Sequence, residues 1–254
     1  MHINTSSLRQ WAGILLLIFF IYPGCSGGSG SKSIKVLIVT GMDHPAHDWE
    51  TTSKAVRREL MKDPRMKVDI LDNPYRLDTV DLQANYDVVF LNFNNWEKPD
   101  PGKEAQENLQ NFVAEGGGLV LMHFACGAFL DWEEFPQLAG KVWDQKNAHD
   151  PRGQFTVELT DTTHPVTKGM ESYVTDDELY TCLTGSKPVA LLARARSVVS
   201  HDQHPMAFTL NYQKGKVFHT TLGHDARAVQ VPGTSRLLRN GVAWAASAPT
   251  HTGP

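Results

Sequence analysis

The chain has 254 residues, of which 24 are lysine or arginine and 28 are aspartate or glutamate, so its formal net charge is −4 with the histidines neutral. No basic run appears, and we expect no nucleic-acid partner, because neutralising phosphates needs clustered lysine and arginine. The residues that follow the N-terminal segment are enough for one large domain.

The N-terminal segment has the features of an export signal. An apolar run over 11–22 follows Arg9 and is shorter than the roughly 20 residues that a membrane span needs. Cys25, followed by glycines and serines, resembles a bacterial lipobox with a flexible tether. We therefore expect an exported lipoprotein of the bacterial periplasm or cell envelope, lipidated at Cys25 and touching the membrane only through that lipid. An ordinary secretory signal and a transmembrane anchor are the alternatives.

Four segments follow from this interpretation. They are a signal peptide with its lipobox over 1–25, a tether over 26–33, one domain over 34–247 and a disordered tail over 248–254.

The first half of the domain alternates between strand and helix patterns. Apolar runs predict buried strands over 34–40, 67–71, 86–91 and 118–122, and helical spacing predicts helices over 51–62 and 104–114. Strands that alternate with helices predict a parallel sheet covered on both faces. The second half is less regular, with strands expected over 154–159, 189–193, 205–210 and 215–221 and a closing helix over 236–246.

The strand ending at His123 carries the strongest local signal. Small residues follow it, at Ala125, Gly127 and Ala128. A tight strand-to-helix turn needs such neighbours, because the residue at its apex holds a strained backbone while its side chain is displayed. We therefore expect His123 to be catalytic, with a helix N-terminus behind it that could stabilise an anion. The alternative is a hydrogen-bonded histidine at a strand end.

Several separate blocks now point to one family. They are GMDHPAHDW, GGGLVLMHFA, HPV (164–166), DDELY (176–180), GKVFHTTLGHD (215–225) and GVAWAA (241–246). In this order they resemble the ThuA-like family, named for trehalose utilisation. The resemblance implies an α/β fold of the class I glutamine amidotransferase-like superfamily. This fold is a flavodoxin-like sandwich, with a mostly parallel central sheet, helices on both faces and extra strands. It also implies a role in sugar or glycoside metabolism.

The resemblance carries one contradiction. Amidotransferases place a cysteine at the position of His123, whereas Cys126 lies three residues later. Thiol catalysis needs a thiolate held beside a base at that apex. We therefore expect no amidotransferase activity.

The acidic block supplies the next candidates. Asp177, Glu178 and Tyr180 match the Asp-Glu-x-Tyr hallmark of the family, which implies that Asp177 and Glu178 are catalytic together with His123. A carboxylate can hold sugar hydroxyls or act as a general base, and Tyr180 can stack on a sugar face. We assign Tyr180, with Asp48 and Trp49 of the first loop, to substrate binding. The alternative is that these acids merely begin a helix, where the dipole favours them.

Histidines in three loops are candidate metal ligands: His47, His149 and His224. If they meet at the carboxyl edge of the sheet, they could hold a divalent metal ion. Otherwise they would bind sugar hydroxyls and move protons.

The resemblance implies a sugar-metabolism protein, and the histidines and acids favour an enzyme over a binding module. The family context implies acid/base chemistry on a glycoside or a trehalose-like 3-keto-disaccharide, with a small-molecule sugar as partner. No G-x-G-x-x-G follows the first strand, so we expect no NAD, and any redox step belongs to a partner sugar dehydrogenase. The alternative function is a non-catalytic carbohydrate-binding lipoprotein.

Overall fold

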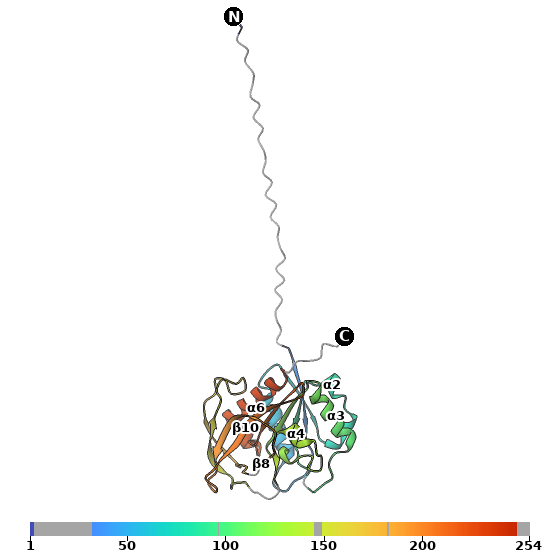
Figure 1. The fold of residues 1–254 in the computed structure, drawn as a ribbon, viewed down its shortest axis with the longest axis vertical. Helices are drawn as coiled ribbons and strands as arrows, with labels where there is room; N and C mark the ends of the chain where they lie inside the picture. The colour runs from blue at the N-terminus through green and yellow to red at the C-terminus, as the bar shows by residue number, and fades with distance from the viewer. Residues whose placement is uncertain (3–31, 96, 145–148, 182, 248–254) are drawn as a thin grey trace. The chain divides into compact units, whose positions relative to one another are not determined.

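The computed structural model describes residues 1–2, 32–95, 97–144, 149–181 and 183–247 (Figure 1). The chain divides into residues 1–31 and 32–254, and the fold described below is that of the second unit. The signal segment, most of the tether and the C-terminal tail lie outside the described residues, as does Cys25. Within the described ranges, no helix has the length and apolar character that crossing a membrane requires.

A nine-stranded sheet forms the centre, in the order β2-β1-β3-β4-β11-β10-β9-β6-β7. Its first five strands are parallel: β2 (Met66–Leu71), β1 (Ile34–Val39), β3 (Val88–Leu91), β4 (Gly118–Met122) and β11 (Gly215–Thr220). The other four extend it antiparallel: β10 (Gln203–Tyr212), β9 (Ala190–Arg196), β6 (Gly153–Leu159) and β7 (Tyr173–Asp177). A separate pair consists of β5 (Val142–Trp143) and β8 (Leu183–Thr184).

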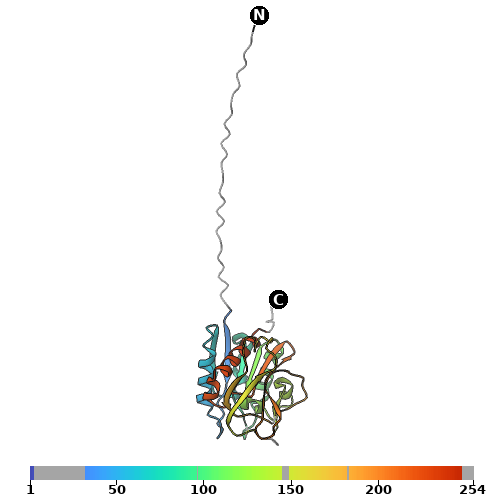
Figure 2. The same ribbon diagram turned by 90° about the vertical axis from the view of Figure 1, so that its left-hand side faces the viewer.

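Helices cover both faces because the side chains of the parallel strands alternate between two cores. Val36 and Ile38 pack towards α1 (Trp49–Leu60) and α6 (Pro232–Ala245), which lie on the same side of the sheet in Figure 2, as does the short α5 (Ala226–Gln230). Leu37 and Val39 pack on the other side. That side holds α3 (Lys103–Ala114), α4 (Phe135–Ala139), α2 (Leu82–Asn85) and the 3₁₀ helix η1 (Pro74–Thr79).

The predicted α/β fold with a mostly parallel sheet, two helical layers and extra strands is confirmed. The strand expected over 86–91 begins only at Val88, and the carboxylate of Asp87, just before it, accepts a hydrogen bond from the Lys35 N–H at 2.8 Å. The closing helix begins at Pro232, a residue whose fixed φ suits a first helical turn. The acidic block ends strand β7, so the helix-start alternative for these acids is wrong.

His219, the next-to-last residue of β11, is a buried titratable group. Its side chain is 0% exposed, its Nδ1 lies 3.0 Å from the Ala139 carbonyl oxygen, and its Nε2 has no hydrogen-bond partner among the described residues. Burial lowers the pKa of His219 from 6.5 to about 4. The folded protein therefore holds this imidazole neutral.

We expect His219 to destabilise the fold in acid. At this histidine the unfolded chain takes up a proton near pH 6.5, whereas the folded chain does so only near pH 4. The free energy of unfolding therefore falls as the pH drops through this window, by up to about 3 kcal/mol. Urea unfolding of wild type and His219→Gln at pH 7 and pH 4 measures this loss of unfolding free energy. The variant, which keeps an amide donor for Ala139, should lose less stability between the two pH values. Equal losses in both proteins would contradict this.

Candidate functional site

Histidines and a carboxylate from four segments meet at the carboxyl edge of the parallel strands. His47 lies in the loop after β1, His123 directly follows β4, and His224 lies in the loop after β11. Glu178 directly follows β7. Parallel strands place their following loops at one edge of a sheet, which is where α/β proteins bind ligands. The antiparallel extension folds back, since β7 contacts α5 and α6, and so brings Glu178 to the same place.

His123 occupies a strained position. Its φ is +49°, in the left-handed region that a histidine rarely adopts, and its side chain is fully buried. The predicted strained apex after the strand is therefore present. The helix expected behind it is a short 3₁₀ helix, η2, over His123–Gly127, and anion stabilisation at its N-terminus stays a prediction.

The tautomer of His123 follows from one contact. Its Nδ1 lies 2.7 Å from the carbonyl oxygen of Thr221. A carbonyl oxygen only accepts hydrogen bonds, so Nδ1 carries the hydrogen, and in the neutral ring Nε2 presents a lone pair. That lone pair faces the other members of the cluster.

Three atoms of the cluster form a small triangle. The Nε2 of His123 lies 3.2 Å from the Nδ1 of His224 and 3.5 Å from the Oε2 of Glu178. The third side, from His224 Nδ1 to Glu178 Oε2, measures 3.0 Å. The other oxygen of Glu178, Oε1, lies 3.7 Å from the Nδ1 of His149. The two oxygens of this carboxylate therefore have different neighbours.

The electrostatics of Glu178 follow from these neighbours. Burial opposes its ionisation, but the imidazoles of His123 and His224, where they are protonated, outweigh that effect and hold the pKa of Glu178 well below its usual range. Glu178 is therefore a carboxylate at neutral pH. It can accept a proton or a cation, but it has no proton to donate.

Asp177 holds the backbone around His224 and Glu178 in place through hydrogen bonds. Its carboxylate is fully buried and accepts three backbone hydrogen bonds, from Gly223 at 2.7 Å, from His224 at 3.1 Å and from Glu178 at 2.9 Å. Burial raises the pKa of Asp177, while His123 and the three N–H groups oppose that rise. Because both of its carboxylate oxygens accept backbone hydrogen bonds, we interpret Asp177 as a positioning residue, where the sequence predicted a catalytic one.

Gly223 makes the tight loop before His224 feasible. Its φ is +106°, and a Cβ there would lie 2.8 Å from the sulfur of Met122. Arg152 fixes the other side of the loop, since its guanidinium contacts Asp225 at 2.7 Å and Asp176 at 3.1 Å. Asp225 also caps α5 by accepting from the N–H groups of Arg227 and Ala228.

His47 completes the cluster. Its ring stacks on Phe124 at 4.2 Å and lies 5.2 Å from the His123 ring and 4.8 Å from the His224 ring. Burial, followed by the neighbouring histidines, lowers its pKa to about 2. It is therefore a neutral imidazole, and its buried Nδ1 has no hydrogen-bond partner among the described residues.

The three histidines that meet differ from the set expected for a metal. The nitrogens of His47, His123 and His224 lie within 4.8 Å of one another. His149 stands apart on the exposed side of Glu178, with its Nδ1 2.8 Å from the carbonyl oxygen of Asp150. In the proposed metal set, His123 therefore replaces His149.

A hollow of about 130 Å³ opens above the cluster. It combines aromatic faces with a few polar groups, as small-molecule sites commonly do. Its lining is His44, Ala46, His47, Asn94, Phe124, Trp143, His149, Glu178 and Tyr180.

Tyr180 lines the hollow, and its role in substrate binding stays a prediction. Its ring is 4.3 Å from that of His123 and 4.9 Å from that of Trp143. Sequence reasoning missed Asn94 and Phe124. The signal for Asn94 was its position in a polar loop directly after the buried strand β3, a place where ligand-binding residues gather.

Asp48 and Trp49 do not belong to the hollow. The carboxylate of Asp48 caps α1 by accepting from the Thr51 N–H at 3.0 Å, and the indole N–H of Trp49 donates to Asp43 at 2.9 Å. Both side chains make their contacts at the start of α1 and away from the hollow, which does not support the substrate-binding role expected for them.

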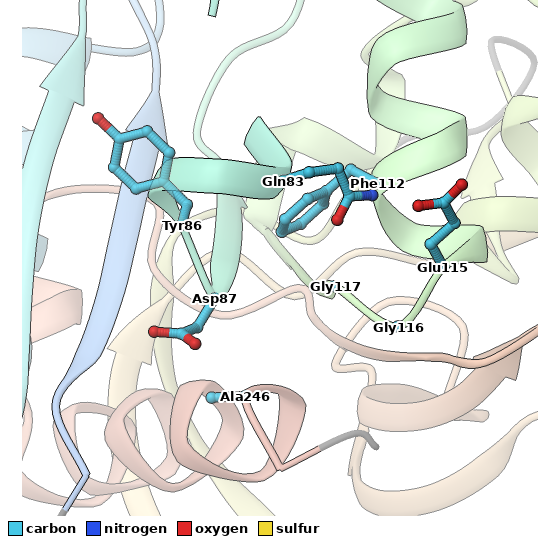
Figure 3. Close-up of a pocket in the computed structure, with 8 residues that line it drawn as sticks. All are labelled: Gln83, Tyr86, Asp87, Phe112, Glu115, Gly116, Gly117 and Ala246. Atoms are coloured by element: carbon cyan, nitrogen blue, oxygen red, sulfur yellow. The ribbon is translucent and has the colours of Figure 1, made fainter. Parts of the chain in front are cut away.

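A second hollow, of about 210 Å³, lies at the opposite edge of the sheet. Figure 3 shows its lining residues, which include Asp87 and Gly117, at the amino ends of β3 and β4, and Ala246 at the end of α6. None of its lining residues is a histidine. The concentration of reactive groups places the candidate site at the histidine cluster.

Comparison with known proteins agrees with this fold. The model of the ThuA family, described as trehalose utilisation, matches residues 35–245. A ThuA-like protein from Parabacteroides merdae is 26% identical, with a TM-score of 0.76 over 88% of this chain and 94% of its own. A ThuA-like protein from Bacteroides uniformis is 22% identical, with a TM-score of 0.68 over 88% and 95%.

The glutaminase domain of a Trypanosoma brucei CTPS shares the fold alone, at 10% identity and a TM-score of 0.50 over 86% of this chain and 96% of its own. No match to the chain was found among curated proteins.

We expect Asp177→Asn to destabilise the protein and loosen the site. An amide offers one oxygen and an N–H₂ group that cannot accept, so buried N–H groups lose their partners, at a cost of about 2–4 kcal/mol. Asp176→Asn is the matched control, because that side chain is 53% exposed and its ion pair with Arg152 contributes at most about 1 kcal/mol. Urea unfolding compares the two. Equal effects would contradict the positioning role.

Proposed function

We propose that this chain, which belongs to the ThuA trehalose-utilisation family, is an enzyme that acts on an oxidised sugar. Family membership supports a role related to sugar utilisation. The observation that carries the finer proposal is the convergence of His47, His123, His224 and Glu178 beneath a hollow with aromatic walls.

The hollow suits a sugar ring. Tyr180, Trp143 and Phe124 offer apolar faces to the C–H groups of a pyranose. Asn94 and His149 offer hydrogen-bonding groups for its hydroxyls. This mixture supports a carbohydrate as the small molecule.

The reacting groups support proton removal beside a carbonyl. In a 3-keto sugar, the carbonyl makes the neighbouring C–H acidic. Glu178, an anion next to His149 through Oε1, would take that proton, and the electron pair would move onto the carbonyl oxygen. The pair would then return to expel the glycosidic oxygen at the next carbon, which leaves as an alcohol after protonation. Cluster imidazoles would stabilise the negative oxygen in the meantime.

A partner enzyme would supply the substrate. Oxidising a sugar hydroxyl to a ketone removes two electrons, which proton transfer at this site does not do. We therefore propose a sugar dehydrogenase in the same pathway.

The test is turnover of paired substrates by the purified chain. Product analysis follows both reactions. We expect the chain to convert a 3-keto-disaccharide and to leave the parent disaccharide unchanged. Glu178→Gln should lower kcat/KM by at least about 100-fold, the usual size of an acid/base contribution, whereas Glu171→Gln, an exposed carboxylate, should not. Sugar binding without turnover would favour the alternative of a carbohydrate-binding protein. Equal turnover of both substrates would refute proton abstraction next to a ketone.

We also propose that the chain is exported and lipidated at Cys25, on the strength of the apolar run and the residues that follow it. Expressed in a bacterium with its own leader, the wild type should take up a radiolabelled fatty acid and sediment with membranes, whereas Cys25→Ser should do neither. Replacing Cys126 by serine is the matched control. A wild type that stays unlabelled and remains in the soluble fraction would refute the lipid anchor.

A further inference from the structure

The spacing of three atoms at the site matches a metal coordination shell. His123 Nε2, His224 Nδ1 and Glu178 Oε2 are separated by 3.0–3.5 Å. Ligand atoms bound at about 2.1 Å lie about 3.0 Å apart at right angles and about 3.4 Å apart in a tetrahedron. The observed triangle fits these values on all three sides.

Hydrogen bonding alone leaves the triangle poorly satisfied. His123 donates through Nδ1 to Thr221, so its neutral Nε2 is an acceptor, and the Glu178 carboxylate is also an acceptor. With both imidazoles neutral, His224 Nδ1 holds the single hydrogen between these two acceptors. Two electron-rich atoms 3.5 Å apart in a buried position are stabilised by a cation.

His47 supplies a third nitrogen. It lies within 4.8 Å of the other two imidazoles, it is 8% exposed, and its Nδ1 is buried without a partner among the described residues. A buried polar atom with no partner needs an explanation, of which an ion is one.

The surrounding contacts orient these groups as they do in metal sites. The Nδ1–H of His123 donates to a backbone carbonyl, which fixes both tautomer and ring direction. The backbone N–H groups of His224 and Glu178 are held by Asp177. Two of the candidate ligands are therefore attached to one buried carboxylate.

We infer that His47, His123 and His224, with Oε2 of Glu178, bind one divalent first-row transition metal ion. Three imidazoles and one carboxylate suit zinc, iron or nickel better than calcium or magnesium, which prefer oxygen. The metal site deepens the proposed function, and the role given to the ion rests on that function. The ion would polarise the sugar carbonyl, while Oε1 of Glu178 and His149 stay available for the proton.

The experiment measures metal binding directly. The full chain, dialysed against a chelator, is titrated with Co²⁺ and Zn²⁺ by calorimetry, and the Co²⁺ complex is followed in its visible spectrum. We expect one ion per chain. His47→Gln, His224→Gln and Glu178→Gln should each weaken binding by about 100-fold or more, and His204→Gln, an imidazole outside the cluster, should not.

Circular dichroism confirms that each variant is folded before titration. Binding that is absent, or that is unchanged in all three cluster variants, overturns the inference, and so does equal weakening in His204→Gln. Turnover is scored separately. Keto-sugar conversion without metal binding refutes the metal site and leaves the proposed function standing, whereas metal binding without conversion does the reverse.

Discussion

The site depends on the hydrogen bonds that the buried carboxylate of Asp177 accepts. This carboxylate joins β7, the last strand of the antiparallel extension, to the loop after β11, which belongs to the parallel half of the sheet. A carboxylate out of water is costly unless its oxygens are fully hydrogen-bonded. The three N–H groups of Gly223, His224 and Glu178 meet that requirement in one geometry, and this geometry sets the distance between His224 and Glu178.

The remaining features of the cluster follow from the strands that carry it. β4 and β11 are paired neighbours, so His123 reaches the Thr221 carbonyl across the strand ends. The positive φ of His123 costs of order 1–3 kcal/mol, which the packing around a fully buried turn has to offset. The strained turn, with the hydrogen bond from Nδ1 to Thr221, aims Nε2 at the cluster. The site is therefore preorganised, as the stabilisation of developing charge requires.

The chain shares its fold alone with a glutaminase domain. The same architecture presents an imidazole at the turn after β4, while Cys126, three residues on, is buried with Tyr180 in a separate small cluster. An imidazole there can orient a carboxylate or bind a cation. Chemistry on this scaffold is thus set by a few side chains at the strand ends, not by the fold itself.

The sequence by itself predicted the parallel half of the sheet and its two helical layers, and it singled out His123, Glu178 and His224 as candidate site residues. Apolar runs and helical spacing report burial directly, and a strand end is visible wherever such a run stops. Only the tertiary structure decided which side chains meet. It moved Asp177 from chemistry to positioning, placed Asp48 and Trp49 at a helix start, and put His123 in place of His149 among the three histidines. The physical reason is that the contacts within the histidine cluster join residues far apart in the chain, a hundred or more positions in the case of His123 and His224, and no local pattern encodes where a folded-back strand brings its last residue.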